Sequence, residues 1–110
     1  MTVPEGTTSS AAGQAGPVLE KGEVADAIIA AIQQLNANVR VIDRDSYWRV
    51  LVSSRCVITR DAVESALGRP FLLPGDLELY MPSFSGRFLV DSHQAIWEAG
   101  GTAVGTGGAA

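Results

Sequence analysis

Apolar residues recur at helical spacing in the first third of the chain. One stripe of an α-helix accommodates residues at i, i+3, i+4, i+7, i+8 and i+11. These positions hold Val24, Ala27, Ile28, Ala31, Ile32 and Leu35. Asn36 and Asn38 come directly afterwards and are typical of a helix end. The pattern predicts a helix that begins at Glu23, ends near Asn36 and buries this stripe.

Short runs of β-branched and aromatic residues flank this helix and predict strands. Pro17–Leu19 is predicted to be an edge strand, because proline at the start of a strand has no N–H for a central ladder. Val39–Ile42 and Tyr47–Ser53 predict a hairpin around the polar turn Asp43–Ser46. Cys56–Ile58 predicts a short third strand.

A second helix is indicated by its capping residues. Thr59 is a favourable N-cap, and Asp61 places negative charge in the first turn, where the helix dipole favours it. Gly68 occupies the position of a left-handed C-cap, and Pro70 prevents continuation. We therefore expect a short helix between Thr59 and Gly68.

The remaining chain predicts three more strands. Pro74–Asp76 is a turn, Leu77–Met81 is predicted to be extended, and Pro82–Gly86 is predicted to be a loop. Strands are predicted at the end, over Arg87–Val90 and Gln94–Trp97, around the turn Asp91–His93. The order β-α-β-β-(β)-α-β-β-β predicts an α+β fold in which two helices pack on an antiparallel β-sheet.

Length and composition are consistent with one such domain. The chain has 110 residues, 46% of them hydrophobic, and its mean hydropathy is +0.17, which suits a packed globule. Residues 1–16 and 100–110 are rich in small residues and predict disordered, flexible tails around a single domain at residues 17–99.

Charge and cysteine content narrow the possible partners. The net charge of −4 argues against nucleic acid, which requires clustered positive charge. Cys56 is the single cysteine, so no internal disulfide forms and a reducing compartment is expected. We find neither a signal-peptide pattern nor an apolar run long enough to span a membrane. These features predict a cytoplasmic protein that does not insert into membranes.

The sequence offers few groups for chemistry. Cys56 and His93 are the candidate nucleophile and base, but Cys56 opens an apolar strand, where a buried, inert thiol is usual, and His93 lies in a polar turn. One histidine and one cysteine are too few for a soft-ligand metal site, and no phosphate-binding glycine motif follows a strand. We expect no catalytic residue, no metal and no cofactor.

Apolar residues near the predicted Pro82–Gly86 loop allow two interpretations. The group comprises Tyr80, Met81, Pro82, Phe84 and Phe88. They fill the core beneath a bend in the first interpretation, which the residues alone slightly favour. In the second, some of them project as anchors of an exposed contact surface.

Three motifs resemble one family. These are Val41–Trp48 (D-R-x-x-Y-W), Leu67–Phe71 (L-G-R-P-F), and Asp76–Glu78 running into Pro82–Arg87 (S-F-x-G). Together, in this order and spacing, they resemble the effector proteins, also called coupling or regulatory proteins, of bacterial soluble diiron monooxygenases. That family belongs to the methane, phenol, toluene and alkene or isoprene systems. The likeness extends over about residues 17–98.

The resemblance implies a non-catalytic, cofactor-free subunit that docks on the diiron hydroxylase component. There it would tune substrate access and O₂ activation, and couple NADH use to hydrocarbon oxidation. The Phe84-containing segment is more similar to that of the aromatic and alkene systems. The resemblance implies that Tyr80, Pro82, Ser83, Phe84, Ser85, Gly86 and Arg87 bind the hydroxylase. We expect a monomer when the protein is free.

A ligand-sensing regulatory domain of ferredoxin-like topology is the alternative. The first β-α-β-β-α-β elements permit it, but such domains usually bind a metabolite at a glycine-rich β-α turn or a dimer interface. Here that turn contains only Gly22.

Overall fold

The computed structural model describes residues 13–99 and confirms the predicted α+β class. The described elements are β1 Gln14–Glu20, α2 Glu23–Leu35, β2 Arg40–Arg44, β3 Tyr47–Ser53, β4 Arg55–Thr59, α3 Arg60–Leu67, α4 Gly75–Tyr80, β5 Ser83–Ser85, β6 Arg87–Val90 and β7 Gln94–Glu98. The predicted tails lie, apart from residues 13–16, outside the described residues.

Helix α2 has the predicted bounds and buries most of the predicted stripe. Leu35 is the exception, because at the last turn of the helix its side chain is 42% exposed. Asn36 caps the helix: its backbone N–H donates to Ile32 O at 2.9 Å. Its side chain exchanges hydrogen bonds with the backbone of Val57 in β4. The cap therefore also fixes α2 against β4.

Strand β1 is central, and the predicted edge strand is wrong. The four-stranded sheet has the order β2-β3-β1-β5, and its pairs are antiparallel. Pro17 is tolerated because the pairing with β3 is interrupted there: Ala15 pairs with Val52 and Val18 with Arg49, while Gly16 and Pro17 have no paired residue in β3 and pair only with β5. The strand also begins at Gln14, inside the segment predicted to be a tail.

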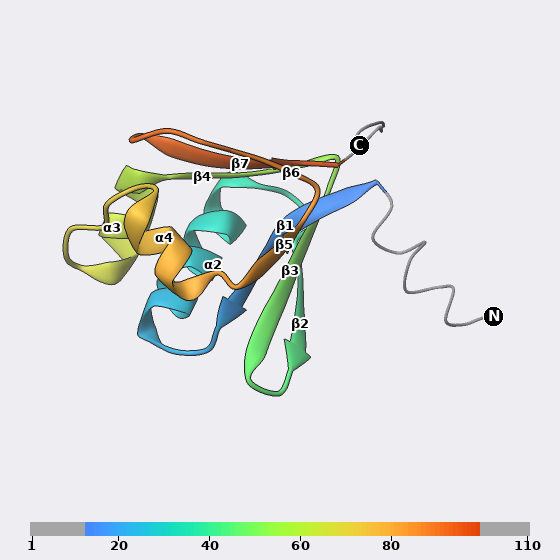
Figure 1. Cartoon of the computed structure of the whole chain (residues 1–110), viewed down its shortest axis with the longest axis horizontal. Coiled ribbons are helices and arrows are strands. Elements are labelled where there is room, and N and C mark those ends of the chain that lie inside the picture. The colour runs from blue at the N-terminus through green and yellow to red at the C-terminus, as the bar shows by residue number, and fades with distance from the viewer. Residues whose placement is uncertain (1–12, 100–110) are drawn as a thin grey trace.

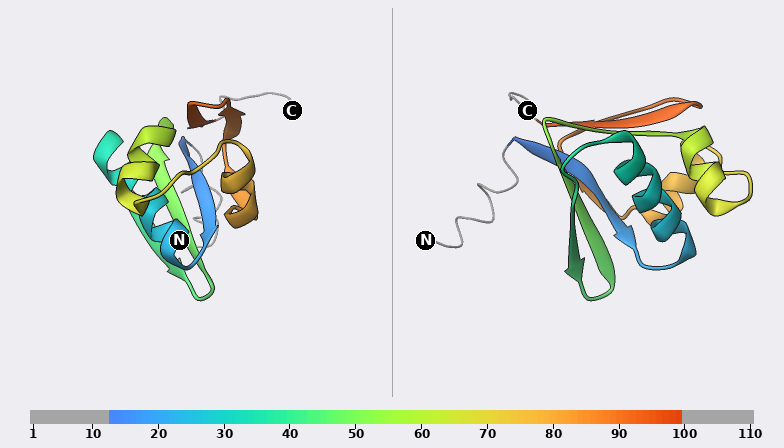
Figure 2. Two further views of the ribbon diagram at one scale, coloured as in Figure 1. Left: turned by 90° about the vertical axis from the view of Figure 1, so that its left-hand side faces the viewer. Right: turned by 180° about the vertical axis from the view of Figure 1, so that it is seen from behind.

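A second, three-stranded sheet has the order β4-β7-β6. The chain crosses between the sheets at two single-residue corners, Ser54 between β3 and β4 and Gly86 between β5 and β6. Both have positive φ, 68° and 97°, which turns the backbone sharply. Figures 1 and 2 show the sheets meeting at an angle, with the helices between them.

Helix α3 follows its predicted capping signals. The Thr59 hydroxyl accepts a hydrogen bond from the Ala62 N–H at 3.2 Å. Gly68 adopts the left-handed conformation at φ 82° and donates its N–H to Glu64 O. These contacts confirm the predicted start and end of the helix.

The predicted strand at Leu77–Met81 is wrong, because Gly75–Tyr80 form helix α4. The Asp76 carboxylate accepts from the Leu72 N–H at 2.8 Å, and the Asp76 N–H donates to Leu72 O. Leu73, Leu77 and Met81 are buried at i, i+4 and i+8, a helical spacing that was present in the sequence. The predicted Pro82–Gly86 loop also contains a strand, β5.

The core lies between the helices and the inner faces of both sheets, and Leu19, Ile28 and Trp97 are among its fully buried members. The order β2-β3-β1-β5 is that of a ferredoxin-like sheet, so the topology of the alternative is present in part, with the three-stranded sheet added. Within residues 13–99, no helix is long and apolar enough to cross a membrane.

Candidate docking surface

Strand β5 forms one edge of the four-stranded sheet and carries three of the seven predicted partner-binding residues. It pairs with β1 through Ser85 with Gly16, Phe84 with Pro17 and Ser83 with Val18. Side chains alternate along a strand. Ser83 and Ser85 therefore share the outer face of the sheet with Val18, whereas Phe84 is on the side that faces the core.

Phe84 is the exposed end of an aromatic stack. Its ring centroid lies 5.2 Å from that of Phe88, which in turn lies 5.3 Å from that of Trp97. Trp97 is fully buried, Phe88 is half-buried and packed against the core, and Phe84 is 42% exposed. The two earlier interpretations thus apply to different residues: Phe88 belongs to the core, and Phe84 is an exposed ring held by it.

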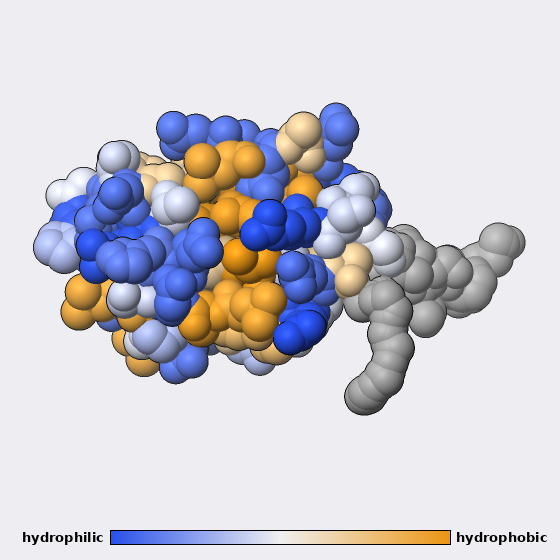
Figure 3. All heavy atoms as spheres, turned by 90° about the horizontal axis from the view of Figure 1, so that it is seen from above, coloured by the Kyte–Doolittle hydropathy of each residue, from blue (hydrophilic) through white to orange (hydrophobic). Residues whose placement is uncertain are grey.

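Gly86 and Arg87 turn away from this edge. A Cβ at Gly86 would lie 2.6 Å from Glu98 O and 2.9 Å from the Ala15 Cβ, so a side chain cannot be accommodated there without a backbone shift. Arg87 pairs with Glu98 at the start of β6. Its side chain is on the outer face of the three-stranded sheet, and Figure 3 shows hydrophobic surface bordered by hydrophilic side chains on this side of the molecule.

Tyr80 and Pro82 precede the edge at the end of α4. Tyr80 is half-buried against the core, Met81 is buried and Pro82 is exposed. The structure thus brings Ser83, Phe84 and Ser85 together on one strand. It places Tyr80 on α4 and Arg87 on the second sheet.

A surface hollow beside β5 contains residues that the sequence reasoning missed. Its volume is about 320 Å³, and it is lined by Val18, Arg44, Tyr47, Arg49, Ser83, Phe84 and Ser85. The Arg49 guanidinium donates to the Ser85 hydroxyl at 3.3 Å. Tyr47 and Arg49 alternate along a predicted strand, so their shared face could have been found from the sequence. Arg44 was predicted to be in the turn Asp43–Ser46, and only the structure extends β2 to it and shows the contact with β5.

Cys56 and His93, the candidate nucleophile and base, lie in structural positions. Cys56 is fully buried, and burial raises the pKa of its thiol to about 12, so at neutral pH it is a poor nucleophile. His93 is exposed in the turn before β7. Its N–H donates to the Asp91 carboxylate, and hydrogen bonds from the backbone N–H groups of His93 and Gln94 lower the pKa of Asp91. A general acid requires the opposite shift.

The Asp43 carboxylate is also held in a structural contact. Asp43 accepts from Lys21 Nζ at 2.6 Å, and this hydrogen bond lowers the pKa of the Asp43 carboxyl. Within residues 13–99, no three histidine, cysteine or acidic side chains are grouped as metal ligands would be.

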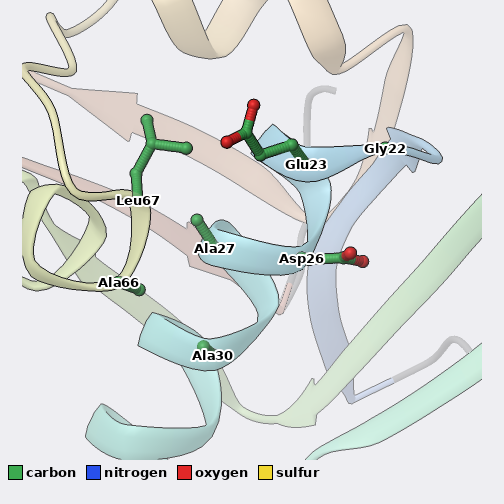
Figure 4. A pocket seen from close by; sticks show the side chains of 7 residues that line it. All are labelled: Gly22, Glu23, Asp26, Ala27, Ala30, Ala66 and Leu67. Carbon is green, nitrogen blue, oxygen red and sulfur yellow. The ribbon is translucent and has the colours of Figure 1, made fainter.

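A second surface hollow is a groove between α2 and α3. Its volume is about 470 Å³, and Figure 4 shows three alanines and Leu67 along it, with Glu23 and Asp26 at one end. Gly22 is at the same end, on the β1–α2 turn. Glu23 is paired with Arg69 at 3.1 Å. The groove contains none of the predicted partner-binding residues.

Comparisons with known proteins agree on one family. The sequence model of the MmoB/DmpM family matches residues 13–98. The effector subunit of the alkene monooxygenase system of Xanthobacter autotrophicus strain Py2 is 39% identical over 84 residues, an alignment that covers 74% of this chain and 82% of that protein.

Solved structures share the fold at lower identity. A chain in the structure of a phenol hydroxylase–regulatory protein complex matches with a TM-score of 0.70 and 20% identity, covering 77% of this chain and 97% of that chain. The soluble methane monooxygenase regulatory protein B matches with a TM-score of 0.64 and 22% identity, covering 91% of this chain and 70% of that chain.

Proposed function

The chain belongs to the MmoB/DmpM family and is an effector, not a catalytic, subunit of a multicomponent monooxygenase, and we propose that it acts by docking the β5 edge on the hydroxylase. The partner is the diiron hydroxylase component, and the substrate is an alkene or aromatic hydrocarbon. The docking residues are Tyr80, Pro82, Ser83, Phe84, Ser85, Gly86 and Arg87.

The exposure of Phe84 is the observation that supports this surface. An aromatic ring that is 42% exposed and stacked on Phe88 is already ordered before binding, so little side-chain entropy is lost when a partner covers it. Rigid aromatic residues of this kind are common anchors of protein interfaces. β5 is also a sheet edge, which lets a partner approach the ring from the side.

The effector changes the hydroxylase by binding one of its conformations more tightly than another. A partner with equal affinity for two conformations shifts neither population, and a shift from 1:99 to 99:1 requires a preference of about 10⁴-fold. Docking of the β5 edge near the active site favours the conformation that admits substrate and activates O₂. Reductant use is thereby linked to product formation.

The test is steady-state oxidation by the reconstituted hydroxylase and reductase with the wild-type chain or Phe84→Ala. We expect Phe84→Ala to lower the product formed per NADH consumed. Leu35→Ala is the matched control, because Leu35 has the same exposed fraction, 42%, at the far end of α2. Thermal unfolding of both variants checks that each is folded. Unchanged rate and coupling with folded Phe84→Ala would refute docking through this ring.

The cytoplasm is the location that we propose. A single cysteine whose thiol is free and fully buried is typical of proteins in a reducing compartment. Subcellular fractionation of the native host, with the hydroxylase followed in parallel, tests this location.

The ligand-sensing alternative requires a metabolite site at the β1–α2 turn. A groove is present there, but it lacks basic side chains to bind an anionic metabolite. The groove at Gly22 is lined by three alanines and Leu67, and its charged members are Glu23 and Asp26. A metabolite that carries phosphate or carboxylate would be repelled there. A dialysed sample whose melting temperature rises with amino acids or nucleotides would favour this alternative.

A further inference from the structure

The outer face of the four-stranded sheet is basic although the whole chain carries a net charge of −4. Pairing of Ile42 with Arg49 and of Arg44 with Tyr47 places Arg40, Arg44 and Arg49 on the same side of the sheet, because side chains alternate along each strand. Glu20, opposite Tyr47, is the acidic residue that the register places on this face. The three arginines therefore outnumber the acid on this surface.

These arginines have no carboxylate partner among residues 13–99. The ion pairs of that part of the chain join Lys21 to Asp43, Arg55 to Glu98 and Arg69 to Glu23. Arg40 and Arg49 instead donate to neutral oxygens, on Gln14 and Ser85. A guanidinium has five N–H donors, so most of those of Arg44 and Arg49 remain available to an acceptor from outside.

The hollow beside β5 brings these donors together. Arg44, Tyr47 and Arg49 line it from β2 and β3, and Ser83 and Ser85 line it from β5. The bond from Arg49 to Ser85 holds one guanidinium at the strand that also carries Phe84. Two planar cations with nearby hydroxyl groups match a carboxylate, which accepts hydrogen bonds from a guanidinium in pairs.

We propose that this hollow receives the carboxylate of an aspartate or glutamate side chain of the hydroxylase. The proposal rests on the proposed function, because the hollow is continuous with the β5 edge. The hydroxylase is chosen as the occupant because Phe84 itself lines the hollow, so a partner that covers the Phe84 ring also lies beside the two guanidinium groups. Charge complementarity then fixes the orientation in which the edge docks.

The test measures the affinity of the folded effector for its cognate hydroxylase, at low and at physiological salt. Arg49→Gln removes the fork, and we expect affinity to fall about tenfold. Arg49→Lys keeps the charge without the fork, and most of the loss should remain. Arg40→Gln is the matched control, because Arg40 is on the same face but outside the hollow. It should change affinity less than about twofold.

The outcomes separate this proposal from the function on which it rests. If the wild-type chain does not bind the hydroxylase or change its coupling, the proposed function fails. If the wild type binds and Arg49→Gln binds equally well, only the carboxylate site is refuted. Equal losses for Arg40→Gln and Arg49→Gln would also refute it, because they would indicate general attraction by the basic face.

A second measurement identifies the occupant directly. The photo-crosslinking amino acid p-benzoylphenylalanine replaces Tyr47, which lines the hollow, in the complex with the hydroxylase. Mass spectrometry should recover a hydroxylase peptide that contains aspartate or glutamate. Two results would overturn the proposal. One is a crosslink to a second effector chain instead of the hydroxylase. The other is a melting temperature that rises with millimolar phosphate or acetate in the wild type but not in Arg49→Gln, while Arg49→Gln binds the hydroxylase as tightly as the wild type does.

Discussion

Replacing Gly86 by alanine should destabilise the protein more than the same replacement at Gly68. Both glycines have positive φ, 97° and 82°, a conformation that is unfavourable for L-residues by about 1–2 kcal/mol. Their surroundings differ. A Cβ at Gly68 meets no atom within 4 Å, whereas a Cβ at Gly86 would lie 2.6 Å from a backbone carbonyl oxygen, that of Glu98. The comparison therefore separates steric overlap from backbone strain.

The expected difference follows from these distances. Overpacking that forces the backbone to move destabilises a protein by about 1–3 kcal/mol, and this term applies to Gly86→Ala alone. The loss of unfolded-state entropy that accompanies glycine to alanine replacement is common to both variants and cancels. Gly86→Ala should therefore be about 1–3 kcal/mol less stable than Gly68→Ala, which corresponds to a melting temperature roughly 4–24 °C lower.

Urea unfolding, followed by the fluorescence of Trp48 and Trp97, measures both variants. Because Gly86 joins β5 to β6, the shift should also displace Phe84 and reduce coupling in the reconstituted oxidation assay. If the two variants are equally stable within about 0.5 kcal/mol, the corner at Gly86 does not constrain the fold as described.

Three further predictions concern stability. Burial raises the pKa of Cys56 from 9.0 to about 12, so the thiol ionises at lower pH in the unfolded state than in the folded state. The free energy of unfolding should therefore fall by up to about 1.4 kcal/mol per pH unit between pH 9 and 12. Urea unfolding at a series of pH values should show this slope in the wild type and not in Cys56→Ala. Asn36→Asp loses the amide donors to Ile32 O and Val57 O and should lower the unfolding free energy by about 2 kcal/mol, with exposed Asn38→Asp nearly neutral as the control. Thr59→Ala removes the cap on α3 and should lower it by about 1 kcal/mol, a loss that Thr59→Ser should largely avoid.

Local signals in the sequence were sufficient for α2, α3 and the β2–β3 hairpin. Their apolar spacing, the Thr59 cap and the Gly68 end involve residues within a few positions of one another, so neighbouring residues decide them. Helix α4 was missed although Leu73, Leu77 and Met81 have helical spacing, because Pro74 and Gly75 indicated a turn. The edge prediction for β1 failed because the sequence does not show which strand lies on either side of Pro17.

The motifs of the chain indicated the family and the segment around Phe84 as the candidate docking surface. The hydropathy pattern showed that the sequence has no long apolar run. Only the tertiary structure decided how that segment is presented. It made Ser83–Ser85 an edge strand, directed Phe84 toward Phe88, and brought Arg49 to Ser85 across 36 positions of sequence. The alternation of side chains is a local property of a strand, but strand pairing and register are set by long-range packing of the core. The hollow beside β5 is formed by that packing, and for this reason it has no sequence motif of its own.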